Sequence, residues 1–177
     1  SPAVINNLKK IIFKKNKKLI ENFKYFRDDL REKNVIEKIF IYAEANNNPI
    51  DAVIHLAGLK AVNESIVDPL LYWDFNLVGT INLLKVMQKY FCKNLIFSSS
   101  ATIYSYSDDL IKEDFTIKPI NPYGKTKSYI ESLLDDLYKS SSGEWKIVNL
   151  RYFNPIGAHY SGFLGEHPIG TPNNVFP

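Results

Sequence analysis

Three nearly continuous apolar runs constrain the fold of this chain more than any other feature of its sequence. They read IDAVIHLAG at residues 50–58, NLIFSSS at residues 94–100 and WKIVNLRYF at residues 145–153. Such runs are typical of strands that are buried on both faces, as the strands of parallel sheets are. The sequence therefore predicts three strands of a buried sheet.

Segments with helical periodicity separate these runs. They cover residues 31–46, residues 69–90 and residues 122–140, and the last two begin at a proline. The stretch FKYFRDDL at residues 23–30 predicts a further short strand, and residues 101–121 predict a long loop. Alternating strands and helices favour an α/β fold with a parallel sheet and right-handed crossovers.

In such sheets, ligands bind beyond the carboxyl ends of the strands. The second apolar run ends there in three serines, the last of which is Ser100, and the loop then leads to NPYGKTK. This stretch places Tyr123 and Lys127 four positions apart on the first turns of a helix, so that both can lie on one face. With 11 tyrosines in the chain, about one such spacing is expected by chance, so its surroundings must decide its meaning. The crossover can bring all three side chains to one cleft.

The chemistry of these groups suits the interconversion of a secondary alcohol and a ketone. A free phenol has a pKa near 10 and is a poor base at neutral pH, but a neighbouring ammonium group lowers that pKa. A serine hydroxyl can hold the oxygen whose proton moves. The hydride must go elsewhere, and this requires a nicotinamide cofactor.

Composition narrows the classes of function. No apolar run approaches the roughly 18 residues of a membrane span. The net charge is +3, and the basic stretch at residues 8–18 favours a solvated helix face over a nucleic-acid or membrane surface. On the same grounds we expect neither nucleic-acid nor membrane partners. The lone Cys92 excludes an internal disulfide, which suits a reducing compartment, so we expect a cytoplasmic protein. We expect a packed core position for His55, and no metal, because His159 and His167 lack metal-ligand spacing.

A set of short motifs resembles one known family. The motifs are AGLKAV at residues 57–62, SSSAT at 98–102, NPYGKTK at 121–127, LRYFNPIGAH at 150–159 and GTPNN at 170–174. Each motif alone is weak, but the set is specific. Together they resemble the UDP-glucose 4-epimerases, which are extended short-chain dehydrogenases/reductases, over residues 28–177.

The resemblance implies roles for individual residues. Tyr123 would be the catalytic acid and base, Lys127 would bind the nicotinamide ribose and tune Tyr123, and Ser100 would bind the sugar hydroxyl. Contacts with the cofactor are also implied for Asp29, Leu30, Leu56, Ala57, Gly58, Leu59, Lys60, Asn76 and Phe153, where Phe75 is an alternative to Asn76. Contacts with the UDP-sugar are implied for Asn154 and Asn174.

The same resemblance implies an NAD-dependent enzyme that interconverts UDP-glucose and UDP-galactose. Tyr123 would take the proton of the 4-hydroxyl group while hydride passes from C4 to NAD. The 4-keto sugar would then rotate, and hydride would return to its opposite face. The family's fold is a Rossmann-like doubly wound parallel sheet, and a homodimer is expected for the full-length protein.

One motif of the family has no match in this sequence. The phosphate-binding glycine motif between the first strand and the first helix is missing. We therefore expect an internal piece of such an enzyme. Residues 1–155 would form a partial NAD-binding domain without its first two strands, and residues 156–177 would begin the substrate-binding region. We also expect the isolated chain to be marginally stable and inactive.

Three alternatives remain open at this point. A nucleotide-sugar dehydratase would need an acid and a base just after the serine, where this chain has Ala101 and Thr102. An epimerase for N-acetylated UDP-sugars would share the same catalytic residues. A non-catalytic truncated remnant could also keep the family's motifs.

Overall fold

The computed structural model describes residues 2–165 of the 177 in the chain. Contacts divide the chain into two units, one of residues 28–153 and one of residues 1–27 with residues 154–177. The predicted domain boundary after residue 155 stays a prediction. The larger unit contains the sheet and the predicted catalytic residues.

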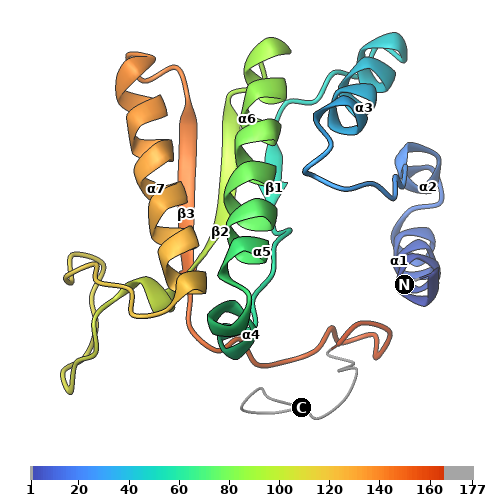
Figure 1. The fold of residues 1–177 in the computed structure, drawn as a ribbon. Coiled ribbons are helices and arrows are strands. Elements are labelled where there is room, and N and C mark those ends of the chain that lie inside the picture. Colours follow the sequence, from blue (N-terminus) through green and yellow to red (C-terminus); the bar gives the residue numbers. More distant parts are fainter. Residues whose placement is uncertain (1, 166–177) are drawn as a thin grey trace. The chain divides into compact units, whose positions relative to one another are not determined.

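The sheet of the larger unit has three parallel strands in the order β1-β2-β3. They are β1 (Val53–His55), β2 (Asn94–Ser100) and β3 (Lys146–Tyr152) (Figure 1). The apolar runs thus form the three predicted strands, and the parallel α/β fold is confirmed. Because the strands are parallel, the loops after them meet at one edge of the sheet.

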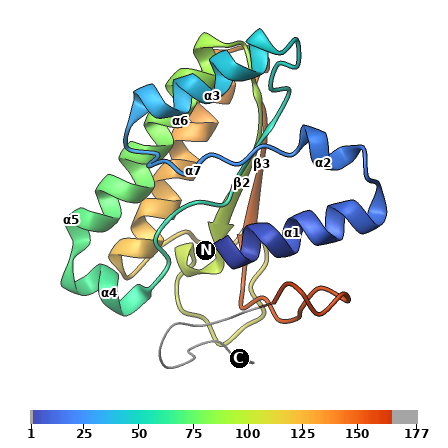
Figure 2. The same cartoon turned by 90° about the vertical axis from the view of Figure 1, so that its right-hand side faces the viewer.

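The helices of this unit cover one face of the sheet (Figures 1 and 2). They are α3 (Lys33–Ala45), α4 (Val62–Val67), α5 (Pro69–Tyr72), α6 (Gly79–Lys89) and α7 (Pro122–Ser140). The starts of α5 and α7 follow from their sequences. The Asp68 carboxylate accepts a hydrogen bond from the N–H of Leu71, and the Asn121 side chain accepts one from the N–H of Gly124. A proline follows each cap at the first helical position.

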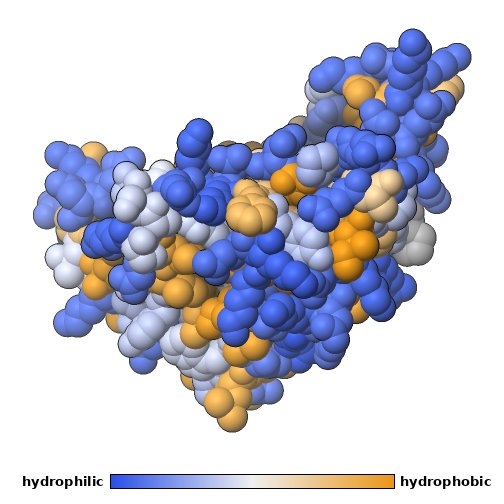
Figure 3. All heavy atoms as spheres, turned by 90° about the horizontal axis from the view of Figure 1, so that it is seen from above, coloured by the Kyte–Doolittle hydropathy of each residue, from blue (hydrophilic) through white to orange (hydrophobic). Residues whose placement is uncertain are grey.

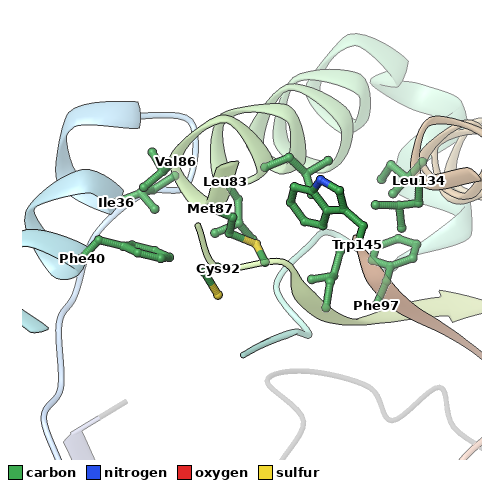
Figure 4. Close-up of a cluster of buried hydrophobic side chains, with 12 residues drawn as sticks. Ile36, Phe40, Leu83, Val86, Met87, Cys92, Phe97, Leu134 and Trp145 are labelled. Carbon is green, nitrogen blue, oxygen red and sulfur yellow. The ribbon is translucent and has the colours of Figure 1, made fainter. Parts of the chain in front are cut away.

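The hydrophobic core lies between these helices and the sheet (Figure 4). Phe97 from β2 packs there with Met87 from α6, Leu134 from α7 and Trp145, which is 2% exposed. Cys92 belongs to this cluster, and burial raises the pKa of its thiol. This environment is the one expected for an inert cysteine.

The opposite face of the sheet differs from the sequence-based expectation that both faces are buried. Ile54 is 63% exposed and Val148 is 49% exposed. Both alternate along their strands with residues that face the helices, such as His55 and Ile147. The exposed face is apolar because its side chains suit a buried sheet, and no described helix of residues 28–153 covers it.

Three local predictions from the sequence need correction. Residues 23–30 form no strand and lie outside the three-stranded sheet. The predicted helix of residues 69–90 is interrupted by a π-helical turn, η1 (Trp73–Val78). The predicted loop of residues 101–121 begins with a 3₁₀ turn, η2 (Ala101–Ile103), and contains an antiparallel bridge between Tyr104 and Ile117.

The smaller unit contains α1 (Pro2–Lys15) and α2 (Leu19–Asn22). Asn7 of α1 donates a hydrogen bond of 2.9 Å to the carbonyl oxygen of Phe163, and the ammonium groups of Lys10 and Lys14 lie over the Phe163 ring.

The surface seen in Figure 3 is mostly hydrophilic, with separate hydrophobic patches. Among residues 2–165, no helix is long and apolar enough to cross a membrane.

Candidate functional site

The candidate site lies where the carboxyl end of β2 meets the first turn of α7. Gly124 permits this meeting, because a β-carbon there would lie 2.5 Å from the carbonyl oxygen of Thr102. No side chain fits in that space, so glycine lets the helix approach the turn that follows β2. The approach brings Ser100 and Tyr123 together although a long loop separates them in sequence.

Ser100 ends β2 and caps the 3₁₀ turn after it. Its hydroxyl oxygen accepts hydrogen bonds from the backbone N–H of Thr102 at 3.2 Å and from the Thr102 hydroxyl at 3.0 Å. It also interacts with the phenol of Tyr123, and this hydrogen bond lowers the phenol's pKa. Two donors to one hydroxyl oxygen leave its own proton free to be donated toward the phenol or a ligand.

Tyr123 is 8% exposed, and its ring makes an edge contact with the Tyr72 ring at 6.4 Å between centroids. Burial disfavours the charged phenolate and raises the pKa of Tyr123 above 10, despite the opposing effect of Ser100. This differs from the expectation that Lys127 lowers that pKa. The Lys127 ammonium lies 5.9 Å from the centroid of the Tyr123 ring, and desolvation outweighs any influence of its charge.

Lys127 is buried, with 5% of its surface exposed. Its Nζ donates a hydrogen bond of 2.8 Å to the carbonyl oxygen of Ser98 and lies 4.9 Å from the centroid of the Phe97 ring. Burial lowers the pKa of Lys127 to about 8. The ammonium group therefore points into the molecule beside Tyr123 and keeps N–H groups that can be donated to a ligand.

His55 lies in the core as expected, and its Nε2 is 2.8 Å from the Thr80 hydroxyl. Burial and then the charge of Lys127 lower the pKa of His55 to about 4. The imidazole is therefore neutral at physiological pH and adds no charge near the site.

The loop after β1 contains Leu56, Ala57, Gly58, Leu59 and Lys60, all five of which were predicted to bind a cofactor. Asn76 anchors this loop from the π-helical turn. Its Oδ1 accepts from the N–H of Leu59 at 2.8 Å, and its Nδ2 donates to the Leu59 carbonyl and to the Thr126 hydroxyl, both at 3.1 Å. Asn76 is 2% exposed, so the structure places it between the loop and α7. A β-carbon on Gly58 would lie 2.9 Å from Asn76 Oδ1 and 3.7 Å from Lys127 Nζ.

The remaining predicted residues lie farther out. The Asp29 carboxylate pairs with Arg31 at 2.7 Å, and the Arg31 guanidinium lies 3.7 Å from the centroid of the Phe75 ring. Leu30 packs against the core. Phe153 follows β3 and is 63% exposed.

The roles of two predicted sugar-binding residues stay predictions. Asn154 belongs to the smaller unit, and Asn174 lies outside the described residues. Among residues 2–165, no group of three or more histidine, cysteine, aspartate or glutamate side chains could hold a metal ion.

Several polar residues that support the site were not predicted. Ser65 accepts a hydrogen bond of 3.2 Å from the N–H of Tyr123. Glu131 is buried on α7 and binds both Ser99 and Arg151. Spacing could have indicated Glu131, because Tyr123, Lys127 and Glu131 recur every four residues and so share one helix face. No comparable pattern indicates Ser65.

Comparison with known proteins gives a consistent result. A family model described as GDP-mannose 4,6 dehydratase matches residues 1–173. UDP-glucose 4-epimerase 2 of Arabidopsis thaliana is 48% identical over 178 residues, which cover 100% of this chain and 48% of that protein. The bifunctional UDP-glucose 4-epimerase and UDP-xylose 4-epimerase 1 of Pisum sativum is 51% identical over 160 residues, covering 90% and 44%. The chain spans about half the length of the curated relatives it matches.

Solved structures agree. The UDP-glucose 4-epimerase from Bifidobacterium longum, in complex with NAD⁺ and UDP, superposes with a TM-score of 0.82 at 42% identity, covering 97% of this chain and 48% of that one. The UDP-glucose 4-epimerase from Brucella ovis, in complex with NAD, has a TM-score of 0.72 at 35% identity over 81% of this chain and 42% of that one. The resemblance to UDP-glucose 4-epimerases that the motifs predict is thereby confirmed.

Proposed function

Because the chain belongs to the family described as GDP-mannose 4,6 dehydratase, we propose that it carries the catalytic groups of an NAD-dependent UDP-glucose 4-epimerase. The proposed reaction interconverts UDP-glucose and UDP-galactose through a 4-keto sugar. The relatives' names support the nucleotide-sugar substrate, and the chemistry of the site supports the reaction type.

One observation carries the proposal. Ser100, Tyr123 and Lys127 come from a strand end and a helix start, and the fold gathers them at one place. All three are less than 9% exposed. Burying a phenol, a serine hydroxyl and an ammonium group together does not stabilise the fold, because each polar group loses solvation. Such buried clusters of ionisable groups are typical of acid/base sites.

The residues present fit a dinucleotide cofactor. The loop of residues 56–60 offers backbone at the end of a parallel strand, where such cofactors bind, and Gly58 in this loop is exposed. The Lys127 ammonium lies next to this loop and can donate to ribose hydroxyl groups. NAD, when bound, would supply the group that accepts and returns the hydride.

Proton transfer falls to the chain's own residues. Tyr123 would take the proton of the sugar's 4-hydroxyl group and later return it, while Ser100 donates a hydrogen bond that holds the sugar oxygen in line. The raised pKa keeps the phenol protonated at neutral pH, ready to act as the acid toward a keto oxygen. As the base, it requires added positive charge nearby, and Lys127 supplies part of that charge from the same helix face.

Dehydration is disfavoured although the family model bears a dehydratase's description. Removing water from a sugar needs a further acid and base near the serine. The two residues that follow Ser100 are Ala101 and Thr102, and the Thr102 hydroxyl already donates to Ser100. No carboxylate occupies the turn of residues 101–103. The proposed reaction therefore eliminates no water from the sugar.

Isotope labelling tests this proposal on the protein purified at its native length. UDP-galactose carrying deuterium at C4 is incubated with the protein and excess NAD, and the products are analysed by mass spectrometry and NMR. We expect UDP-glucose that keeps its deuterium at C4, because the hydride leaves and returns within one site. A product lighter by one water would instead identify a dehydratase, and unchanged UDP-galactose would contradict the proposed function.

A further inference from the structure

A buried polar network lies behind the candidate site, one helical turn beyond Lys127. At its centre is Glu131 of α7, which is 6% exposed. Its carboxylate accepts a hydrogen bond of 2.5 Å from the Ser99 hydroxyl and further bonds from the Arg151 guanidinium, at 2.7 Å to Nη2 and 3.1 Å to Nε. The proposed chemistry uses none of these three groups.

The network ties together the elements that carry the catalytic residues. Ser99 immediately precedes Ser100 on β2, and Arg151 is the residue opposite Ser99 in the ladder with β3. Glu131 shares α7 with Tyr123. The Ser99–Glu131 bond thus fixes the end of β2 against the same helix that presents the phenol.

Arg151 extends the network to the loop after β2. Its Nη1 donates to the Tyr104 hydroxyl and to the carbonyl oxygen of Glu113, both at 2.8 Å. Tyr104 forms the antiparallel bridge with Ile117, which closes the loop on itself. One guanidinium group therefore holds helix, strand and loop in a single arrangement, and its planar fork suits this task better than a lysine would.

Stability alone does not account for this arrangement. A buried ion pair contributes little net stability compared with apolar side chains of similar size, because both charges lose their hydration. The network instead fixes the relative positions of its side chains, since each hydrogen bond allows only a narrow range of distance and angle. Ser99 is the residue before Ser100, and Glu131 lies one turn beyond Lys127, so the network adjoins groups for which an error of a fraction of an ångström matters to proton transfer.

We propose that Glu131 is a positioning residue that sets the distance between Ser100 and Tyr123 by holding Ser99, with Arg151 coupling this setting to the loop of residues 104–118. The catalytic part of this inference rests on the proposed function, but its geometric part does not. Removing the Ser99–Glu131 bond releases the end of β2, and the hydrogen bond between Ser100 and the phenol weakens with it.

The inference is tested with Ser99→Ala and Glu131→Gln in the native-length protein. Tyrosine labelled with ¹³C at the phenol carbon is titrated by NMR, and Tyr123→Phe assigns the signal. Because the Ser100 bond lowers the pKa of Tyr123, weakening that bond in Ser99→Ala should raise the pKa. The other ionisable groups near the phenol are Lys127 on its own helix, and Tyr72 with its partner Glu64, and neither variant touches them.

Kinetics supply the second measurement. We expect kcat to fall about 10-fold in Ser99→Ala, which removes the bond to Glu131, while KM changes less than twofold. The fall should be smaller in Glu131→Gln, because its amide oxygen can still accept from Ser99 although it no longer carries the charge that pairs with Arg151. Asp135→Asn is the matched control for Glu131→Gln: it removes a carboxylate one turn farther along α7, where Asp135 pairs with Lys139 at the surface. That control should match the wild type.

The outcomes are distinguishable. An unchanged phenol pKa and kcat in Ser99→Ala, with at most a lower melting temperature, would show that the network is only structural and overturn the inference. Ser99→Ala decides the matter even where Glu131→Gln does not fold. A wild-type protein without epimerase activity would overturn the proposed function, while the NMR titration would still test the positioning of Tyr123.

Discussion

Gly124→Ala is the substitution for which the structure predicts most. A β-carbon at this position would lie 2.5 Å from the carbonyl oxygen of Thr102 and 3.2 Å from its carbonyl carbon. Both atoms are backbone, so no side-chain rotation relieves the overlap, and α7 must move away from the turn after β2 by about 0.5 Å or more. Ser100 and Tyr123 lie on opposite sides of this contact, so the distance between them should increase.

Two effects set the size of the change in stability. Overpacking costs about 1–3 kcal/mol, and the rigid neighbours here place it at the upper end. Alanine in a helix is favoured over glycine by about 1 kcal/mol, which offsets part of this cost. We expect a net loss of about 2 kcal/mol in the free energy of unfolding, together with a fall of about 10- to 100-fold in kcat.

Gly79→Ala is the matched control for this prediction. Gly79 begins α6, and a β-carbon there would meet the Leu30 side chain at 3.4 Å, an ordinary contact. This variant should be as stable as the wild type or more stable by up to about 1 kcal/mol, with kcat within twofold. Urea denaturation and the epimerase assay measure both variants. Equal stability and equal activity of the two alanine variants would refute the proposed close approach.

Other substitutions test the remaining parts of the site. Lys127→Met should abolish epimerase activity yet leave the protein at least as stable at pH 7, because burying the ammonium group is unfavourable. The pKa of Lys127 is about 8 in the folded state and 10.5 in the unfolded state. The free energy of unfolding of the wild type should therefore rise by up to about 3 kcal/mol relative to this variant between pH 8 and pH 10.5, as measured by urea denaturation. For His55 the folded pKa of about 4 lies below 6.5, so its contribution to stability is present above pH 6.5 and is lost as the pH falls to 4; His55→Gln should remove this part of acid denaturation, and an unaltered pH profile would contradict the assignment. Asn76→Ala should release the Leu59 loop and lower the amount of NAD that co-purifies, whereas an unchanged NAD content would show that the anchor is dispensable. The isolated 177-residue chain should not turn over UDP-galactose, since the exposed apolar face at Ile54 and Val148 leaves its sheet weakly supported; measurable turnover would show otherwise.

Much of the larger unit follows from the sequence because its signals are local. The strand at residues 94–100 and the helix at residues 122–140 have the predicted bounds, since apolar continuity marks one and an Asn-Pro cap marks the other. The cluster of Ser100, Tyr123 and Lys127 also follows, because parallel topology returns a helix start to the preceding strand end. The resemblance of the motifs to a known family indicated which reaction these residues could catalyse.

Other features depend on contacts that no local pattern contains. The pKa of Tyr123 rises because the whole fold buries it, and a single neighbouring lysine does not compensate. The π-helical turn positions Asn76 between the loop after β1 and Thr126, a tertiary role that spacing does not reveal. Residues 23–30 have the composition of a strand but lie outside the sheet, because strand formation depends on context more than on composition.

Replacing one hydroxyl group tests the central claim most directly. Tyr123→Phe removes the proposed acid and base and little else, and Tyr129→Phe removes a hydroxyl from an exposed ring on the same helix, in contact with Trp73. UDP-galactose turnover by the native-length protein is measured for both. We predict a loss of about 100-fold or more for Tyr123→Phe and no change beyond twofold for Tyr129→Phe. Equal turnover by the two variants would contradict the claim that the Tyr123 phenol moves the proton.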